Sequence, residues 1–477
     1  MQDKLVSRKR ECEELQRCLE SDRSEFVIIS GRRRIGKTYL IDKFFNYKYD
    51  FTFVGEHKTS ATVQIQNFMR AIYRQSKKRQ PKATTWYDAF NALEDYLETL
   101  PSNRKKVIFI DEMPWMDTQR SNFVSALENF WNGWGNRRTD IVLIATGSAT
   151  SWMTDKIEGN QGGLHARITC NLHLSPFNLR ETEEYLRQRN CQWDRYQLLQ
   201  CYMIFGGVPF YLSLLNPSDS LAQNIDRLFF AEGAQLKGEF DELYNALFAQ
   251  ADSYVSIVKL LSENKAGMTR EDILRATGIE GTFLSKILKN LERCDFIMRL
   301  SQYGNKTRNS LFRLTDFFTL FYYKFIEPNN TKDERWWSNN IDSRSVLSWM
   351  GLGFELVCLS HHKQIKIALG IAGVGTSVST WRSKADSENG IPGFQIDLII
   401  ERADRIIHLC EMKFSTDLYG ITDSYESKLR ERTGLFRLAT KNKKALVITF
   451  VTTYGVVNGK HKSIVHSEVK MDDLFNS

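Results

Sequence analysis

The stretch that decides the fold reads Gly31-Arg32-Arg33-Arg34-Ile35-Gly36-Lys37-Thr38. An apolar run, residues 26–29, leads into it, and a helical pattern over residues 39–44 follows it. The stretch satisfies the pattern G-x-x-x-x-G-K-[ST], which in this strand-to-helix context is typical of a phosphate-binding loop. Its glycines permit a tight turn whose backbone N–H groups face a phosphate chain. We therefore expect this segment to bind a nucleoside triphosphate.

Individual side chains of this loop have distinct expected roles. Lys37 would bring a positive charge to the outer phosphates and act in catalysis, and Thr38 would offer its hydroxyl to Mg²⁺. The positive end of the following helix would also face the anion. The residues expected at the nucleotide are Gly31, Arg32, Arg33, Arg34, Ile35, Gly36, Lys37, Thr38 and Tyr39. The alternative is an ordinary Gly-containing basic turn, which would not need every fixed position of the pattern.

Length and composition are those of an ordinary protein of several domains. At 477 residues the chain is too long for one core, and three domains are the natural expectation. The net charge of +8 is a modest basic bias that is compatible with nucleic acid. The 8 cysteines are scattered without a C-x-x-C pair, so neither a zinc site nor a disulfide framework is expected. Without a signal peptide or an apolar run of ~18 residues, we expect a cytoplasmic protein with no membrane partner.

A second apolar strand ends in two carboxylates. Roughly residues 1–240 alternate strand-like and helix-like patterns, which predicts a parallel sheet flanked by helices. Within this region, the apolar run 106–110 is followed by Asp111 and Glu112. We expect Asp111 to hold Mg²⁺ and Glu112 to polarise the attacking water. Strand ends are often acidic, and the complete phosphate-binding loop upstream favours the functional interpretation.

Polar residues also follow a third strand, residues 141–145. Thr146 or Ser148 could touch the γ-phosphate or the attacking water, or they could simply form a strand-to-helix turn. Arg167 could reach a nucleotide in its own chain or in a neighbouring subunit and neutralise charge in the transition state. A solvated or structural arginine is the open alternative.

Residues 255–325 show the order of a helix-turn-helix with a wing. Residues 270–277 and 282–294 predict helices, and strand patterns at 296–300 and 310–314 flank a polar tip. Lys286 and Lys289 fall on the outer face of the second helix, and Lys306 and Arg308 fall on the wing. This distribution suits DNA phosphates, although such modules also serve as lids or docking surfaces for proteins. The aromatic cluster between residues 317 and 325 is expected to be core.

Near the C-terminus, two apolar strands at 395–400 and 406–413 predict a hairpin. If its loop is 403–405, Asp397 lies opposite Glu411, and alternation places Lys413 on the same face as Glu411. Charges on a buried face are costly unless they are paired or bind a metal. We expect Asp397 and Glu411 to hold Mg²⁺ or Mn²⁺ and Lys413 to orient a metal-bound water at a phosphodiester.

Several motifs together resemble the archaeal-type P-loop ATPases, which are relatives of the AAA+ and STAND groups. The resemblance rests on residues 7–11, 111–115, 146–148 and 206–211, and it covers residues 1–240. It implies that residues 7–11 lie beside the adenine, that residues 206–211 open a helical lid, and that Arg167 acts as an arginine finger.

The C-terminal pattern Asp397-x13-Glu411-Met412-Lys413 resembles the core of PD-(D/E)xK nucleases. Trp381 and the ending 469–475 resemble the nuclease-like domain that closes many archaeal-type ATPases. The resemblance implies that Glu355, on a preceding helix, is a further metal ligand. A fold that kept the hairpin but lost cleavage is the alternative. His361 and His362 lack a spaced partner and are expected to be surface residues.

The sequence therefore predicts an α/β protein with several domains. We expect a P-loop ATPase core at 1–175, a helical lid at 176–245, a winged helix-turn-helix at 246–330 and a nuclease-like domain at 331–477. The expected function is ATP hydrolysis coupled to metal-dependent DNA binding or cleavage, with ATP and Mg²⁺ as cofactors. The competing hypothesis is a signalling or scaffold ATPase whose C-terminal domain is catalytically silent. A homo-oligomer or a partner protein is compatible with both.

Overall fold

The computed structural model describes residues 5–476, except 80, 149–151, 154, 155, 157–162, 165, 249, 306–308 and 384–392. Lys306 and Arg308, the expected wing cations, lie outside the described residues. Contacts divide the chain into two compact units, Met1–Ser175 and Pro176–Ser477. The second unit holds the segments predicted as lid, winged helix and C-terminal domain. Among the described residues, no helix combines the length and apolar character needed to cross a membrane.

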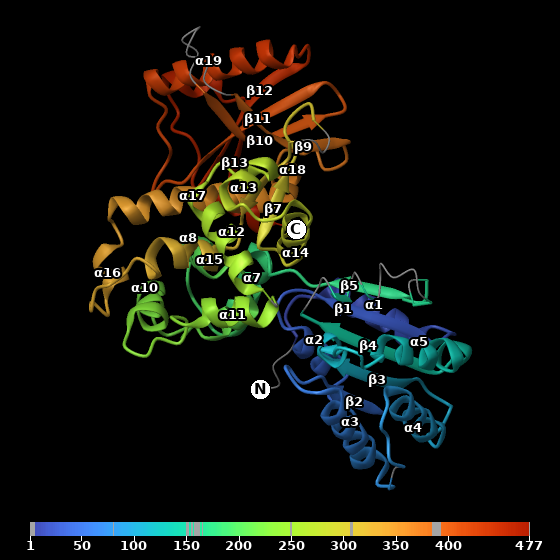
Figure 1. Cartoon of the computed structure of the whole chain (residues 1–477). Coiled ribbons are helices and arrows are strands. Elements are labelled where there is room, and N and C mark those ends of the chain that lie inside the picture. Colours follow the sequence, from blue (N-terminus) through green and yellow to red (C-terminus); the bar gives the residue numbers. More distant parts are fainter. Residues whose placement is uncertain are drawn as a thin grey trace. The chain divides into compact units, whose positions relative to one another are not determined.

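The described residues of the first unit form a five-stranded, wholly parallel sheet in the order β2-β3-β4-β1-β5 (Figure 1). The strands are β1 (Glu25–Ser30), β2 (Phe51–Val54), β3 (Lys106–Asp111), β4 (Ile141–Gly147) and β5 (Cys170–His173). The central strands are buried along their whole length, as their continuous apolar runs predict. The predicted parallel sheet is confirmed. Its geometry brings the residues that follow β1, β3 and β4 to one edge.

Helices cover both faces of this sheet. Alternate residues of β1 face opposite ways, so Phe26 and Ile28 pack with one layer and Val27 and Ile29 with the other. The first layer contains α3 (Ala61–Ser76), α4 (Trp86–Glu98) and α5 (Phe123–Gly133). The second contains α1 (Lys9–Glu20) and α2 (Lys37–Phe44), and short helical turns occur at η1 (Met113–Met116) and η2 (Gly135–Arg137).

The second unit begins with helices. They are α7 (Leu179–Gln188), α8 (Arg195–Phe205), α9 (Pro209–Ser213), α10 (Leu221–Ile225), η4 (Asp226–Phe230) and α11 (Glu239–Leu247). Gly206 ends α8 in a left-handed conformation, with φ 66°, and Pro209 starts α9. Their apolar side chains join one large core, which also takes in the aromatic residues between 317 and 325. The expectation that this aromatic cluster is core is confirmed.

A small helix–sheet module follows. It comprises α12 (Ala251–Glu263), β6 (Met268–Thr269), α13 (Arg270–Thr277), α14 (Gly281–Arg293), β7 (Ile297–Leu300) and β8 (Leu311–Leu314). The described strands pair antiparallel in the order β6-β8-β7. Thr269 caps α13 by a reciprocal capping box with Asp272. The predicted helices and strand pair are confirmed, and the interpretation as a winged helix stays a prediction.

The C-terminal part contains a mixed sheet. Its described strands have the order β13-β12-β11-β10-β9, in which β9, β10 and β11 pair antiparallel and β11, β12 and β13 pair parallel. The strands are β9 (Thr376–Ser383), β10 (Phe394–Arg402), β11 (Ile406–Lys413), β12 (Ala445–Thr452) and β13 (Ser467–Lys470). The helical segments are α15 (Phe317–Phe321), η5 (Tyr322–Ile326), α16 (Trp336–Asn340), α17 (Arg344–Ser360), α18 (His362–Ala368), α19 (Asp423–Thr440), η6 (Lys460–Ile464) and η7 (Met471–Phe475). The predicted hairpin with its turn at 403–405 is confirmed by the pairing of Glu401 with Ile407.

One expectation about this unit is wrong. His361 is not a surface residue but is 2% exposed. Its Nε2 accepts the backbone N–H of Leu179 at 3.1 Å, and its Nδ1–H donates to the carbonyl of Val357 at 2.9 Å. The imidazole therefore caps the start of α7 from inside the core. The sequence does not predict this role, because the backbone amide that His361 caps belongs to Leu179, which is far away in the chain.

Acidification should destabilise the second unit through His361. Burial lowers the pKa of His361 from its ordinary 6.5 to about 4 in the folded protein. The folded state therefore favours the neutral ring, and this contribution of about 3 kcal/mol is lost as the pH falls from 6.5 towards 4. We expect the urea midpoint to fall steeply over this range. Replacement by glutamine, which keeps an acceptor, should flatten the dependence. Burial also lowers the pKa of His408, so part of the pH dependence should remain. A pH profile of His361→Gln identical to that of the wild type would contradict the assignment.

Candidate functional site

The loop after β1 has the backbone that its glycines demand. Gly31 has φ 144°, and a Cβ there would lie 2.4 Å from the carbonyl oxygen of Leu174. Gly36 has φ 82° and immediately precedes α2. Both values are rare for residues with side chains. The two glycines therefore allow the chain to turn from the end of β1 into the start of α2.

Lys37 bends back over this loop. Its side chain is buried, and its Nζ donates to the carbonyl oxygens of Gly31 at 3.0 Å and Arg32 at 3.1 Å. It also donates to Oγ of Ser148 at 2.8 Å. A compact ammonium group with several oxygen partners at the end of a central strand is well placed to bind phosphate oxygens. The expected place of Lys37 in the site is thus consistent with its contacts.

Asp111 joins the loop to the neighbouring strand. It ends β3, and its Oδ2 accepts the hydroxyl of Thr38 at 2.8 Å, while its Oδ1 accepts the hydroxyl of Thr146. Burial raises the pKa of Asp111, and the hydrogen bonds from Thr146 and Thr38 oppose that shift. A hydroxyl and a carboxylate this close together supply oxygen ligands of the kind that Mg²⁺ prefers. Thr38 and Asp111 would hold this ion, which would neutralise phosphate charge.

Glu112 is held in an uncommon conformation next to Asp111. Its φ of 48° lies in the left-handed region, which is costly for a residue with a side chain. Its Oε1 accepts the hydroxyl of Ser148 at 2.5 Å, and its Oε2 accepts the backbone N–H of Ser148 at 3.1 Å. Ser148 therefore links Lys37 to Glu112 through one hydroxyl. The carboxylate that we expect to act on water is fixed in position by this link.

The structure separates the two polar candidates at the end of β4. Thr146, expected at the nucleotide, is fully buried, and its hydroxyl donates to Asp111 and accepts the N–H of Glu112 at 3.2 Å. The Thr146 hydroxyl therefore positions the two acidic residues, and Ser148 is the residue that faces Lys37. Alternation would place both side chains on one face, but β4 ends at Gly147, so Ser148 lies beyond the strand and no longer follows its pattern.

The remaining predicted residues of the first unit lie around this centre. Tyr39 is 43% exposed on α2, and Arg32 is fully buried. Arg8, in the segment expected near adenine, has φ 60° and donates to the carbonyl of Ser175 at 2.8 Å. Arg167 is exposed in the turn before β5, where its N–H bonds to the carbonyl of Leu164 at 2.9 Å. Its role as an arginine finger stays a prediction.

His57 was missed in the sequence, and the structure brings it to the same edge of the sheet. It follows β2, and its ring lies 5.2 Å from the ring of Trp115. Burial lowers the pKa of His57, the charges of Lys58 and Arg33 lower it further, and that of Glu112 raises it. The only available signal was its place after a strand of a parallel sheet, which many residues share.

In the second unit, the expected acidic residues are held by cations. The guanidinium of Arg313 lies 3.2 Å from Oδ1 of Asp397 and 3.4 Å from Oε2 of Glu355. Burial, and next the charge of Asp397, raise the pKa of Glu355 to about 7, while Arg313 and Lys413 oppose this shift. Gln395 also donates to Asp397 at 2.7 Å. Arg313 was not recognised in the sequence, although an arginine in the apolar strand 311–314 was a signal.

Glu411 has a different set of partners. Its carboxylate accepts the hydroxyl of Tyr425 at 2.6 Å and forms an ion pair with Arg432, both on α19. Lys413 Nζ lies 3.7 Å from its Oε2, in agreement with the expected proximity of these two strand residues. Burial and the charge of Glu411 raise the pKa of Tyr425. Glu411 is thus bound to the helix that covers its face of the sheet.

The expected joint metal site of Glu355, Asp397 and Glu411 is not assembled in this structure. Among the described residues, no group of three or more His, Cys, Asp or Glu side chains could hold a metal ion. The expectation placed Asp397 opposite Glu411 by the hairpin register, and the pairing of Leu398 with Cys410 agrees with that register. The pairing of β10 with β9, however, shifts between Ile396 and Ile399. These two residues lie in one apolar cluster although they are three positions apart. Asp397 lies inside this irregular stretch, where alternation no longer predicts its direction.

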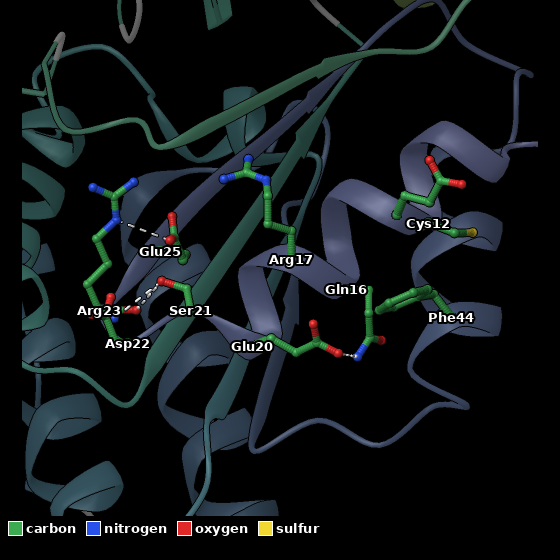
Figure 2. A pocket seen from close by; sticks show the side chains of 10 residues that line it. Cys12, Gln16, Arg17, Glu20, Ser21, Asp22, Arg23, Glu25 and Phe44 are labelled. Carbon is green, nitrogen blue, oxygen red and sulfur yellow. Dashed lines mark hydrogen bonds and ion pairs between the residues drawn. The ribbon is translucent and has the colours of Figure 1, made fainter.

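A separate hollow of about 750 Å³ opens beside α1 (Figure 2). Arg17 and Glu20 of α1 line it, together with Arg23 and Glu25, whose side chains lie 3.2 Å apart. Glu25 begins β1, whereas the phosphate-binding loop follows the end of that strand at Ser30. The hollow is therefore at the opposite end of β1 from the candidate nucleotide site.

Several known proteins are similar to this chain. An uncharacterized protein of Methanocaldococcus jannaschii is 27% identical over 334 residues, covering 68% of this chain and 69% of the relative. The Walker-type ATPase of Pyrococcus abyssi is 16% identical with a TM-score of 0.49, covering 67% of this chain and 96% of that chain. The ORC2 protein of Aeropyrum pernix, in ADPNP–ADP complexes, is 18% identical with a TM-score of 0.43, covering 72% and 96%.

The family comparison concerns the part of the chain that contains the nucleotide site. Residues 5–215 match the model of a family described as an ATPase domain predominantly from Archaea. The matched range contains the phosphate-binding loop, the acidic pair at the end of β3 and the polar residues at the end of β4. The candidate nucleotide site therefore lies within the range that matches an ATPase domain found predominantly in Archaea.

Proposed function

We propose that ATP binding and hydrolysis by residues 5–215 control a metal-dependent reaction on DNA at the C-terminal sheet. The ATPase half of this proposal rests on the link from Lys37 through Ser148 to Glu112, which joins the phosphate-binding loop to the expected water-activating carboxylate. The resulting site can bind a triphosphate and orient an attacking water. Glu112 would accept a proton from that water, while Lys37 would stabilise negative charge on the phosphates.

The DNA half of the proposal rests on the acidic residues of the C-terminal sheet. Helix α17 supplies Glu355, β10 supplies Asp397, and β11 supplies Glu411 and Lys413. The charges of Asp397 and Lys413 both act on Glu355, so these groups share one electrostatic environment. Exposed Lys286 and Lys289 on α14 would add sequence-independent contacts to phosphates. Carboxylates beside a lysine suit metal-assisted hydrolysis of a phosphodiester.

One observation favours the competing function, a scaffold or signalling ATPase with a silent C-terminal domain. Asp397 and Glu355 share Arg313, and Glu411 is paired with Arg432, so each of the three expected ligands has a cationic partner. A site that had lost metal binding could retain such pairs for structural reasons.

Cleavage assays distinguish the two functions. Linear and circular DNA would be incubated with the protein and Mg²⁺ or Mn²⁺, with and without ATP. Under the proposal, Glu411→Gln lowers the cleavage rate by on the order of 100-fold or more, since a metal site supplies several kcal/mol. The matched control is Glu468→Gln, which removes another lysine-paired carboxylate of this sheet and should leave cleavage intact. Full cleavage by Glu411→Gln would exclude the assigned site, and no cleavage in any condition would favour the scaffold function.

A further inference from the structure

Arg313 is a buried charge that reaches from one sheet to another. It lies on β8, in the small antiparallel sheet, and its side chain is only 4% exposed. Its two carboxylate partners belong to other elements, Asp397 to β10 and Glu355 to α17. Burying a guanidinium is costly unless acidic partners compensate for the lost hydration. The ion pairs therefore join the small helix–sheet module to the C-terminal sheet.

The loop after β7 holds the same two parts together. The backbone N–H of Tyr303 donates to the carbonyl of Thr380 at 2.7 Å, and Thr380 N–H donates to the carbonyl of Ser301 at 3.0 Å. The ring of Tyr303 packs 4.9 Å from that of Phe436. Tyr303 lies in the polar tip between β7 and β8, and its backbone pairs with β9 of the C-terminal sheet. Arg313 is thus delivered to the acidic pair by a docked segment.

The guanidinium occupies a place that suits a divalent cation. Asp397 and Glu355 carry like charges and both contact Arg313, so a positive charge beside them stabilises the pair. Carboxylate oxygens are also the ligands that Mg²⁺ and Mn²⁺ take. The guanidinium of Arg313 and a divalent cation would therefore compete for this pair of carboxylates.

We propose that Arg313 is an internal plug that keeps the acidic pair of Asp397 and Glu355 closed to metal until β8 withdraws. The proposal rests on the proposed function in taking this pair as part of the C-terminal metal site. It adds the regulation of that site: the small module must move away from the sheet before a divalent cation can bind. The docked Tyr303 and the plug act together, because Tyr303 lies in the connection between β7 and β8, the strand that carries Arg313.

Binding of Mn²⁺ alone tests the plug. The affinity of the full chain for Mn²⁺ would be measured from the loss of the free-ion electron paramagnetic resonance signal, without DNA or nucleotide. Arg313→Met should bind Mn²⁺ at least about tenfold more tightly than the wild type, since an arginine neighbour typically changes a carboxylate's affinity for a cation by at least that factor. Adding Asp397→Asn to Arg313→Met should remove the gain. Arg313→Lys, which keeps the charge, should retain weak binding.

Two further variants control the test. Arg195→Met removes ion pairs with Glu183 and Asp472 in the same unit and should leave Mn²⁺ affinity unchanged. Should Arg313→Met not fold, Tyr303→Ser loosens the docked loop while keeping the arginine, and it should also bind Mn²⁺ more tightly. A folded Arg313→Met, or a folded Tyr303→Ser in its place, with wild-type affinity would overturn the plug. Tighter Mn²⁺ binding without DNA cleavage in any variant would reject the proposed function alone and leave the plug standing.

Discussion

Glu112→Gln should lower ATP turnover by about two to three orders of magnitude while leaving ATP binding nearly intact. Glutamine preserves the shape of the side chain and can still accept the hydroxyl of Ser148, but it cannot accept a proton from water. The loss therefore falls on kcat rather than on KM. Steady-state phosphate release gives the turnover, and titration with a fluorescent ATP analogue gives the affinity.

Two companion variants make this expectation specific. Lys37→Ala removes a positive charge from the phosphates in the bound and the transition state, so both affinity and turnover should fall. Ser148→Ala breaks the link between Lys37 and Glu112 but keeps both groups, so a smaller loss of about tenfold is expected. Unchanged turnover in Glu112→Gln would show that another group activates the water.

Gly31→Ala should destabilise the ATPase unit by about 3 kcal/mol and abolish tight nucleotide binding. The added Cβ would lie 2.4 Å from the carbonyl oxygen of Leu174 and 2.5 Å from Cδ1 of Ile35, and the backbone φ is 144°. The Leu174 contact is with backbone, so no side-chain rotation can relieve it. Thermal unfolding and nucleotide titration would measure the two effects.

The matched control for Gly31→Ala is Gly133→Ala. Gly133 ends α5 in the same unit, a Cβ added to it would meet nothing within 4 Å, and it is absent from the residues with positive φ. Its replacement should change stability by less than about 1 kcal/mol. Equal stability of the two variants would show that the loop can adopt another path.

Local patterns predicted the parts of the fold that depend on neighbours in sequence. The strand before Gly31, the helix after it and the hairpin turn at 403–405 all follow from apolar runs and turn residues. The helix at 270–277 follows from its capping box and amphipathic pattern. Such features need only a few consecutive residues, because hydrogen bonds and side-chain periodicity act over short distances.

The details that the sequence left open depend on contacts between distant segments. Thr146 and Ser148 are nearly equivalent as sequence, but the end of β4 turns one towards Asp111 and the other towards Lys37. Asp397 was placed by the hairpin register, which carries no information about its ion pair with Arg313 of a distant strand. No local pattern marks these outcomes.

The sequence by itself determined the nucleotide chemistry of this protein. A phosphate-binding loop requires glycine, lysine and threonine at set spacings, because backbone conformation and charge must be supplied within a few residues. Only the tertiary structure decided how the acidic groups of the C-terminal part are used. Arg313, Asp397 and Glu355 lie far apart in the chain, and the cost of burying their charges is met only where folding brings them together.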